Sequence, residues 1–141
     1  MPTPQARQRL PETLLDRLFA KVARDLPTKT TKQHLWSGRH VMIVDGGGVS
    51  MPDTRKNQEA YPQPNSQKPG CGFPIAKFGV LFSLATGAAV ALTINSLNTH
   101  DVKLARLLYK KLNCGDILLG DRAFGSYADF VFVQHHQADA V

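Results

Sequence analysis

Two aspartates in this sequence each follow a short apolar run. Asp45 follows Val-Met-Ile-Val at residues 41–44, and Asp121 follows Ile-Leu-Leu-Gly at residues 117–120. Apolar runs of this kind are typical of buried strands. Two carboxylates at one edge of a sheet repel each other, but they make a binding site when a divalent cation lies between them. Mg²⁺ prefers carboxylate, phosphate and water oxygens, so the pair predicts metal-assisted phosphoryl transfer.

Each aspartate also has a purely structural interpretation. Asp45 and Gly46 form a favoured pair for a hairpin turn. Asp121 could cap a helix or pair with the neighbouring Arg122. Taken singly, neither acid identifies a site. Taken together with the elements between them, the two acids favour a metal site.

Other patterns that could carry chemistry are weaker. Cys114 with the pair His135-His136 could suggest zinc, but no four ligands have the usual spacing. The glycine triplet at residues 46–48 could cradle a phosphate, but it belongs to no GxGxxG motif and no GK[ST] follows it. The serines and histidines form no recognisable nucleophile motif.

The elements before and after Asp45 follow from apolar periodicity and from turn residues. Pro11 begins a predicted helix, and Pro27 ends it. Its apolar face holds Leu14, Leu15, Leu18, Phe19 and Val22. A polar linker covers residues 28–37, and residues 39–46 predict a buried strand followed by turn residues. Residues 51–72 are rich in proline and predict a long loop, a kind of segment that is usually functional or disordered.

Between the two acids the sequence predicts two strands and a helix. The strands cover residues 74–84 and 88–96, joined by turn residues 85–87. Asn98 or Thr99 caps the helix that follows. One face of this helix holds Val102, Ala105, Leu108 and Leu112, and the helix ends at Asn113 and Gly115.

The strand before Asp121 leads into the last predicted element. Ser126 could cap a helix over residues 127–137, although Phe-Val-Phe-Val at residues 130–133 has the propensity of a strand. The predicted order is strand, strand, strand, helix, strand, helix. If the first and fourth strands are neighbours, Asp45 and Asp121 converge.

The composition favours a cytoplasmic protein with polyanionic partners. The 141 residues carry a formal net charge of +6 with a pI of about 9.6, which favours nucleic acid as a partner. The longest apolar stretch, residues 78–94, is short for a membrane helix, and the N-terminus has no apolar signal segment. Cys71 and Cys114 lie far apart in the sequence, so reduced thiols are expected. The length fits one domain or part of one.

Three stretches resemble the catalytic core of bacterial insertion-sequence transposases of the DDE class. The first is VDGGGVSMPDTRKNQEAYPQP at residues 44–64, where Asp45-Gly46, residues 49–54 and Asn57 match the family. The second is FPIAKFGVLFSLATGAAV at residues 73–90. The third is GDILLGDRAFGSY at residues 115–127, which matches a D-R-x-F-x-S-Y motif. The resemblance covers roughly residues 38–134.

This resemblance implies a fold and a function. The implied fold is α/β, a ribonuclease-H-like mixed sheet with flanking helices that is incomplete at the C-terminus. It occupies residues 38–141 as a partial catalytic domain, after an N-terminal helix and linker in residues 1–37. The implied function is DNA transposition by metal-dependent strand cleavage and transfer, with Mg²⁺ or Mn²⁺ as cofactor. The implied partner is the DNA of the transposon ends, and the implied location is the bacterial cytoplasm in association with the nucleoid, without a membrane.

The same resemblance assigns roles to individual residues. The catalytic and metal-binding residues that it implies are Asp45 and Asp121. The residues that it implies could contact DNA phosphates are Arg122, Tyr127 and Lys56. It does not imply an oligomeric state or a target sequence.

The sequence departs from the family in two respects. Gly47 and Gly48 stand where the family usually has threonine or serine. The family's third acid, a glutamate on a helix beyond a fifth strand, is missing, because both glutamates, Glu12 and Glu59, precede Asp121. We therefore expect an inactive fragment that lacks the fifth strand and exposes a sheet edge. The alternatives are a non-catalytic nucleic-acid-binding remnant and a metal-dependent nuclease of the same fold.

Overall fold

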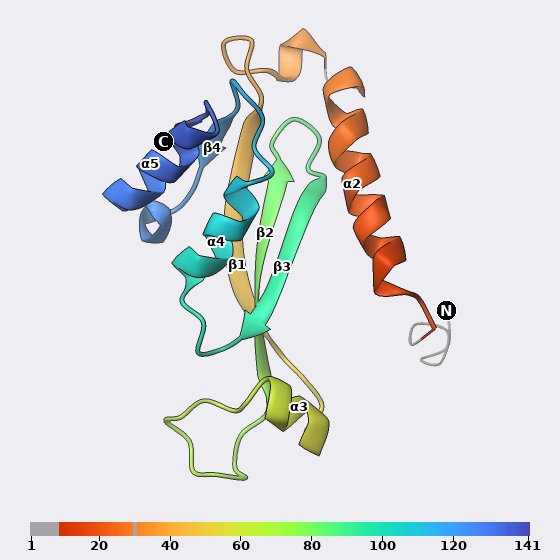
Figure 1. Cartoon of the computed structure of the whole chain (residues 1–141), viewed down its shortest axis with the longest axis vertical. Coiled ribbons are helices and arrows are strands. Elements are labelled where there is room, and N and C mark those ends of the chain that lie inside the picture. The colour runs from red at the N-terminus through yellow and green to blue at the C-terminus, as the bar shows by residue number, and fades with distance from the viewer. Residues whose placement is uncertain (1–8, 30) are drawn as a thin grey trace.

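The structure is a computed structural model that describes residues 9–29 and 31–141. Its helices are α2 (Glu12–Lys29), α3 (Arg55–Ala60), α4 (Asp101–Tyr109) and α5 (Tyr127–His135), with 3₁₀ turns η1 (Lys32–His34) and η2 (Arg122–Phe124). Its strands are β1 (Val41–Ser50), β2 (Ile75–Ser83), β3 (Ala89–Ser96), β4 (Ile117–Leu119) and β5 (Asp139–Ala140). Figure 1 shows these elements along the chain.

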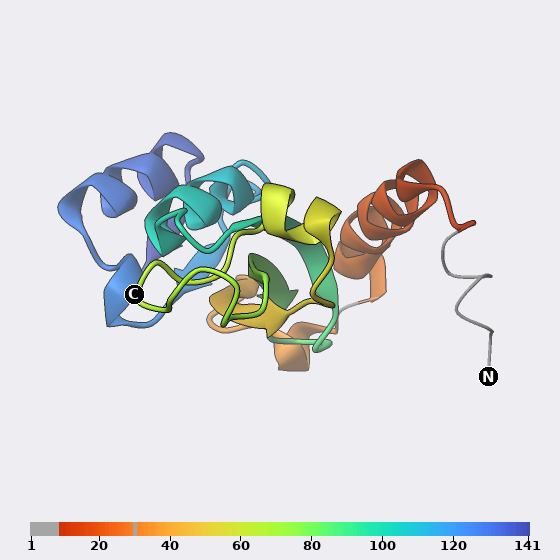
Figure 2. The same ribbon diagram turned by 90° about the horizontal axis from the view of Figure 1, so that it is seen from below.

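The strands form one mixed sheet in the order β3-β2-β1-β4-β5. β1 is antiparallel to β2 and parallel to β4, which confirms that the first and fourth predicted strands are neighbours. Helices α4 and α5 cover one face of the sheet, and α2 lies along its β3 edge (Figure 2). The fold is therefore α/β with a mixed sheet and flanking helices, of the ribonuclease-H-like class that the sequence predicted.

The core lies between the sheet and α4. Leu81 and Val44 of the sheet are buried against Leu108 and Tyr109 of α4, because alternate strand residues face the helix. The opposite face of the sheet is more open, since Leu92 and Ile94 on β3 remain exposed there. The helices thus protect one side of the sheet.

Strand β1 is longer than the sequence predicted. It continues through Gly46, Gly47 and Gly48 to Ser50, so the expected turn after Asp45 is wrong. The three glycines pair in register with Gly79, Phe78 and Lys77 of β2, and this long-range pairing overrides the local turn preference of Asp-Gly. A side chain at Gly47 would lie 3.0 Å from the Phe78 ring, so the glycine lets this ring lie close against β1.

Helix α2 corrects two predictions about the N-terminal segment. Pro27 lies inside its last turn and does not end the helix; the fixed φ of proline is compatible with a helix, and the hydrogen bond that it removes is confined to this last turn. Most of the predicted apolar face stays exposed, including Leu14 and Leu18. The helix contacts the sheet at β3, and an open cavity of about 720 Å³ lies between them.

The boundaries of α4 differ from the sequence prediction, whereas the start of α5 agrees with it. His100 precedes α4 as its N-cap residue instead of Asn98 or Thr99, and α4 ends at Tyr109, before Leu112. Ser126 caps α5 as predicted, since its side chain accepts a hydrogen bond from the backbone of Asp129. The Phe-Val-Phe-Val run therefore lies in a helix, and the strand alternative is wrong.

Two further elements were not expected. Helix α3 lies within the predicted loop of residues 51–72, beyond the end of the sheet where β1 ends (Figure 1). The fifth strand, expected to be missing, begins as β5 and pairs in parallel with β4. Arg39 fixes β5, because its guanidinium donates to the Asp139 carboxylate at 2.6 Å and to the Gly115 carbonyl at 2.7 Å.

Candidate active site

Asp45 lies in the middle of β1, and not at its C-terminal end as predicted. Its backbone is opposite Val80 of β2, so the position of the carboxylate is fixed by the central part of the sheet. The Oδ1 atom accepts a hydrogen bond from the Gly46 backbone N–H at 2.7 Å. No described contact engages Oδ2, and the side chain is exposed. The rigid strand thus presents one carboxylate oxygen to solvent.

Asp121 lies two residues beyond the end of β4. It is the N-cap residue of η2, where Oδ1 accepts a hydrogen bond from the Ala123 backbone N–H at 2.7 Å. The structural interpretation of Asp121 as a cap is therefore correct, and the ion pair with Arg122 is not formed among the described residues. This hydrogen bond uses one carboxylate oxygen and holds the Asp121 side chain just beyond the end of β4.

The register of the parallel strands brings the two acids toward each other. The last β1–β4 pair joins Ile43 to Leu119. Asp45 comes two residues after Ile43, and Asp121 comes two residues after Leu119. Because β4 ends there, β1 has no parallel neighbour beside Asp45, and the sheet opens at this border. Asp45 and Asp121 both line the open groove at this position, which has a volume of about 260 Å³.

Two further charged residues line the same groove. Lys77 on β2 and Asp101 in the first turn of α4 form an ion pair of 3.0 Å. The carboxylate of Asp101 is favourably placed at a helix N-terminus. The groove therefore combines Asp45, Asp101 and Asp121 with one lysine. Within residues 9–29 and 31–141, however, no three His, Cys, Asp or Glu side chains are grouped closely enough to hold a metal ion.

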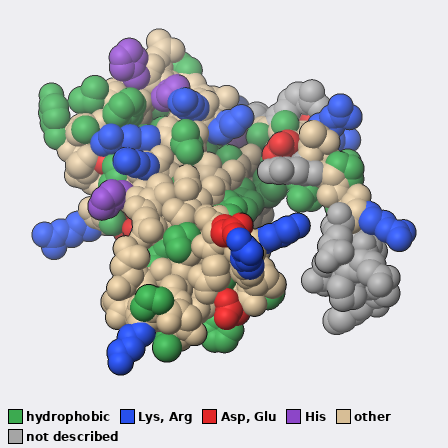
Figure 3. All heavy atoms as spheres, turned by 60° about the horizontal axis from the view of Figure 1, so that its bottom comes forward, with side chains coloured by type: hydrophobic (Ala, Val, Ile, Leu, Met, Phe, Trp, Pro, Cys, Tyr) green, Lys and Arg blue, Asp and Glu red, His purple; other side chains and the backbone are tan. Residues whose placement is uncertain are grey.

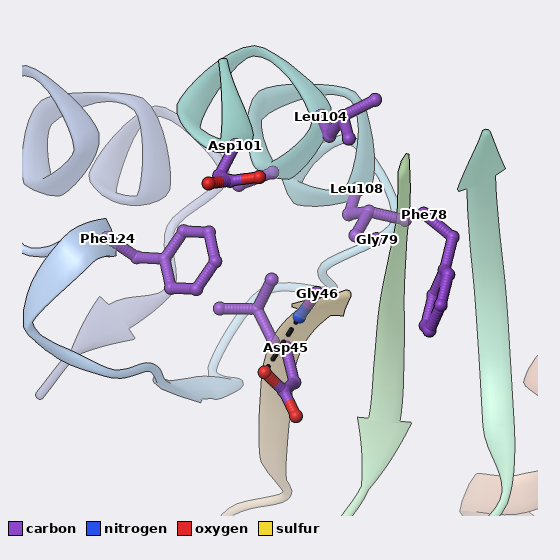
Figure 4. A pocket seen from close by; sticks show the side chains of 10 residues that line it. Asp45, Gly46, Phe78, Gly79, Asp101, Leu104, Leu108 and Phe124 are labelled. Atoms are coloured by element: carbon purple, nitrogen blue, oxygen red, sulfur yellow. Dashed lines mark hydrogen bonds between the residues drawn. The ribbon is translucent and has the colours of Figure 1, made fainter. Parts of the chain in front are cut away.

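The close view in Figure 4 shows how the acids are oriented. The Asp45 carboxylate points away from α4, to the same side of the sheet as Phe78. Asp101, Leu104 and Phe124 lie on the α4 side. A cavity of about 10 Å³, close to the smallest that can hold one water molecule, is lined by residues of both groups. Asp45 thus lines the groove from β1, and Asp101 lines it from α4.

The predicted DNA-contacting residues are not gathered in one place. Arg122 follows Asp121 directly and lines an adjacent depression of about 140 Å³. Tyr127 is highly exposed at the start of α5. Lys56 is exposed on α3, beyond the far end of β1. Arg122 and Tyr127 therefore follow the groove residue Asp121 closely in the sequence, whereas Lys56 lies on α3, beyond the sheet.

The comparison with known families identifies the domain. The family described as transposase DDE domain matches residues 36–141, which include both acids and every strand of the sheet. The chain belongs to this family. Searches of the curated proteins and of the solved structures find no match.

The transposase DDE domain links this chain to DNA transposition. Proteins of this kind act on DNA, which agrees with the net charge of +6. None of the helices in the described part of the chain is long and apolar enough to span a membrane.

Sequence reasoning missed Lys77 and Asp101 as groove residues. Their contact joins β2 to α4 across a separation of 24 residues, and such a contact has no local signature. One signal was present: Lys77 is the only charged residue in the apolar segment Ile75–Ser83. A charge in a central strand needs a partner, and Asp101 supplies it.

Proposed function

We propose that this transposase DDE domain takes part in metal-dependent cleavage and transfer of DNA strands, with Asp45 and Asp121 as ligands of Mg²⁺ or Mn²⁺. The observation that carries the proposal is that both acids line one groove. Each lies two residues beyond the last paired residues of the parallel strands β1 and β4. The match of residues 36–141 to the family supports it.

The chemistry of the donor set fits such an ion. Asp45 and Asp121 each use Oδ1 for a local backbone hydrogen bond, and each keeps Oδ2 for another partner. Mg²⁺ is usually bound by one or two carboxylates with water and substrate phosphates completing its shell. When bound, such ions activate the attacking oxygen and stabilise the leaving oxygen of phosphoryl transfer.

The protein's own residues supply position and charge. β1 is paired with β2 both before and after Asp45 along the strand. The backbone of Asp45 therefore cannot shift without opening this pairing. Asp121 is held by its cap hydrogen bond to Ala123. Lys, Arg and His side chains gather over the half of the surface in Figure 3 that carries α4 and α5, and they supply attraction for a DNA backbone. We propose Arg122, Tyr127 and Lys56 as additional DNA contacts.

We also propose that these 141 residues alone do not cleave DNA. The third acid implied by the family resemblance would be a glutamate after Asp121, and the sequence has none there. Efficient phosphoryl transfer through two ions needs both of them held in place. With Asp45 and Asp121 alone, one ion binds weakly and the second lacks a ligand.

Calorimetric titration with Mn²⁺ tests the metal site. The wild-type chain should bind Mn²⁺ weakly, and Asp45→Asn and Asp121→Asn should each remove the binding. Asp16→Asn is the matched control, because it makes the same charge change at an exposed residue of α2 that does not line the groove, and it should leave binding unchanged. Equal binding by all four proteins would contradict the assignment of the two acids.

A cleavage assay on DNA carrying the element's ends tests activity. The wild-type chain should give no product with Mg²⁺ or Mn²⁺. Product that disappears in Asp45→Asn would refute the inactivity and would support the site.

A specific observation favours the second candidate, a non-catalytic nucleic-acid-binding protein. The described residues bring no three metal ligands together, whereas the surface is basic. Salt-sensitive DNA binding without any Mn²⁺ binding would select this second function. Metal-dependent cleavage of DNA of any sequence would instead select the nuclease.

A further inference from the structure

We infer that Lys77 is a phosphate-contacting residue of the groove, and that Asp101 is the residue that positions it. The inference deepens the proposed function and rests on it, because it names the group that would receive a DNA phosphate beside the two acids. Neither residue belongs to the acid pair from which the site was predicted.

The position of Lys77 restricts where its ammonium can lie. Its backbone is paired with Gly48 on one side and Asn95 on the other, so it lies in a central part of the sheet. The side chain faces α4, as Gly79 two residues later does, where an added Cβ would meet Leu108. Only 22% of the side chain is exposed, and the exposed end opens into the groove.

The charges of the groove require a cation for any phosphate that enters. Asp45, Asp101 and Asp121 line it, and a phosphodiester beside three carboxylates is repelled at short range. Lys77 is the one cationic side chain among the described residues that line the groove. An ammonium has three N–H donors, and the ion pair with Asp101 engages Lys77 from the α4 side only. Donors on its other side are available to phosphate oxygens.

Asp101 fixes the direction of this ammonium. Its Oδ1 lies 3.0 Å from the Lys77 Nζ, and it belongs to the first turn of α4, whose next turns are buried in the core. The flexible lysine stem is thereby held at both ends, by β2 and by α4. A positioned ammonium loses less conformational entropy on binding phosphate than a free surface lysine does.

The salt dependence of DNA binding tests the contact. Binding of a short fluorescein-labelled duplex is measured by anisotropy over a series of KCl concentrations, for wild type, Lys77→Gln and Lys21→Gln. Lys21 is the matched control, because it is an exposed lysine on α2, at the other edge of the sheet, and does not line the groove. Each phosphate contact contributes about 0.9 to the slope of log K against log[salt]. Lys77→Gln should lower the slope by about one contact, and Lys21→Gln should leave it unchanged.

The outcomes separate this inference from the proposed function. If the wild-type chain does not bind the duplex, or binds it without salt dependence, the proposed DNA function fails and the inference fails with it. If the wild-type chain binds with a normal slope and Lys77→Gln has the same slope, the inference alone is overturned. A purely structural ion pair would change stability, measured by urea unfolding, without changing the slope.

A second measurement needs no variant and covers the case in which Lys77→Gln does not fold. The wild-type chain is acetylated with and without the duplex, and the lysines are read by mass spectrometry. DNA should lower the acetylation of Lys77 and leave that of Lys21 unchanged. Equal acetylation of Lys77 in both samples would overturn the inference. The variant Asp101→Asn should raise the acetylation of Lys77 in the free protein, because the ammonium is no longer held.

Discussion

The ion pair between Arg106 on α4 and Asp129 on α5 predicts an asymmetric response to mutation. The Nε of Arg106 lies 2.9 Å from Oδ1 of Asp129, and the two side chains are 35% and 2% exposed. The Ser126 hydroxyl donates a hydrogen bond to the same carboxylate. The arginine also lies 4.9 Å from the centre of the Phe132 ring. The buried member of the pair is therefore the acid.

The burial of the two partners sets the expected magnitudes. Arg106→Met leaves the Asp129 carboxylate buried without its cation, and breaking a buried pair in this way costs about 3–5 kcal/mol. The lost contact with Phe132 adds about 0.5–1 kcal/mol. Asp129→Asn leaves an arginine that can turn toward water, so we expect a cost of about 1–2 kcal/mol. The double variant should be more stable than Arg106→Met alone, because no unpaired charge is buried.

Urea unfolding at neutral pH measures all three variants. Arg55→Met is a matched control, because Arg55 forms an ion pair with Glu59 while its side chain is 93% exposed, and exposed pairs contribute about 0.5 kcal/mol or less. The reasoning is refuted if Asp129→Asn destabilises the protein more than Arg106→Met does. It is also refuted if the double variant is less stable than both single variants.

Three further predictions concern stability. Burial, with a smaller effect of nearby Asp129, raises the pKa of Tyr109 from 10.0 to about 12. The unfolded state therefore loses this proton first, and stability should fall by about 2–3 kcal/mol as the pH rises from 10 to about 12. Tyr109→Phe should remove this part of the pH dependence in urea titrations, and an unchanged dependence would contradict the assignment. Gly79→Ala should cost about 1–3 kcal/mol in thermal unfolding, because its Cβ would lie 3.1 Å from Thr93 Oγ1 and 3.3 Å from Leu108 Cδ1; an unchanged melting temperature would refute this crowding. Gly115→Ala should cost about 1–2 kcal/mol in urea unfolding, because Gly115 has φ +84° with open space around it; no loss would show that the backbone relaxes.

The sequence predicted the parts of the fold that depend on local patterns. The hairpin of β2 and β3 follows from two apolar runs around a turn in which Gly87 has φ +68°. The neighbouring β1 and β4 follow from two apolar runs that each precede an acid. Ser126 as a helix cap follows from its residue type. For the turn, the two runs and the cap, the determining residues are close together in the chain, whereas the pairing of β1 with β4 joins residues as far apart as Val41 and Ile117.

The parts that were missed depend on distant partners. Nothing near residues 46–48 shows that the glycines continue a strand, because their partners are residues 77–79 of β2. The short strand β5 depends on Arg39, about 100 residues earlier in the chain. Helix α4 begins after His100 because Thr99 still belongs to the preceding turn, where its N–H donates to the Ser96 carbonyl.

The candidate site was predicted to a similar extent. Asp45 and Asp121 stand out in the sequence because each follows an apolar run, and the structure places both at one groove. Whether they hold a metal ion stays a prediction. Lys77 and Asp101 could not be paired from the sequence, because their partnership is made by the packing of α4 on β2.

The different backbone settings of the two acids have a kinetic consequence. The backbone around Asp45 is paired with β2, so the amides that bond to β2 exchange only when this pairing opens, which costs more free energy than the opening of a single turn. Asp121 lies at a single 3₁₀ turn that can open alone. The groove can therefore lose and regain Asp121 many times while Asp45 stays in place. A ligand that bridges the two acids would be seen first as slower exchange in residues 121–125, with the amides of β1 unchanged.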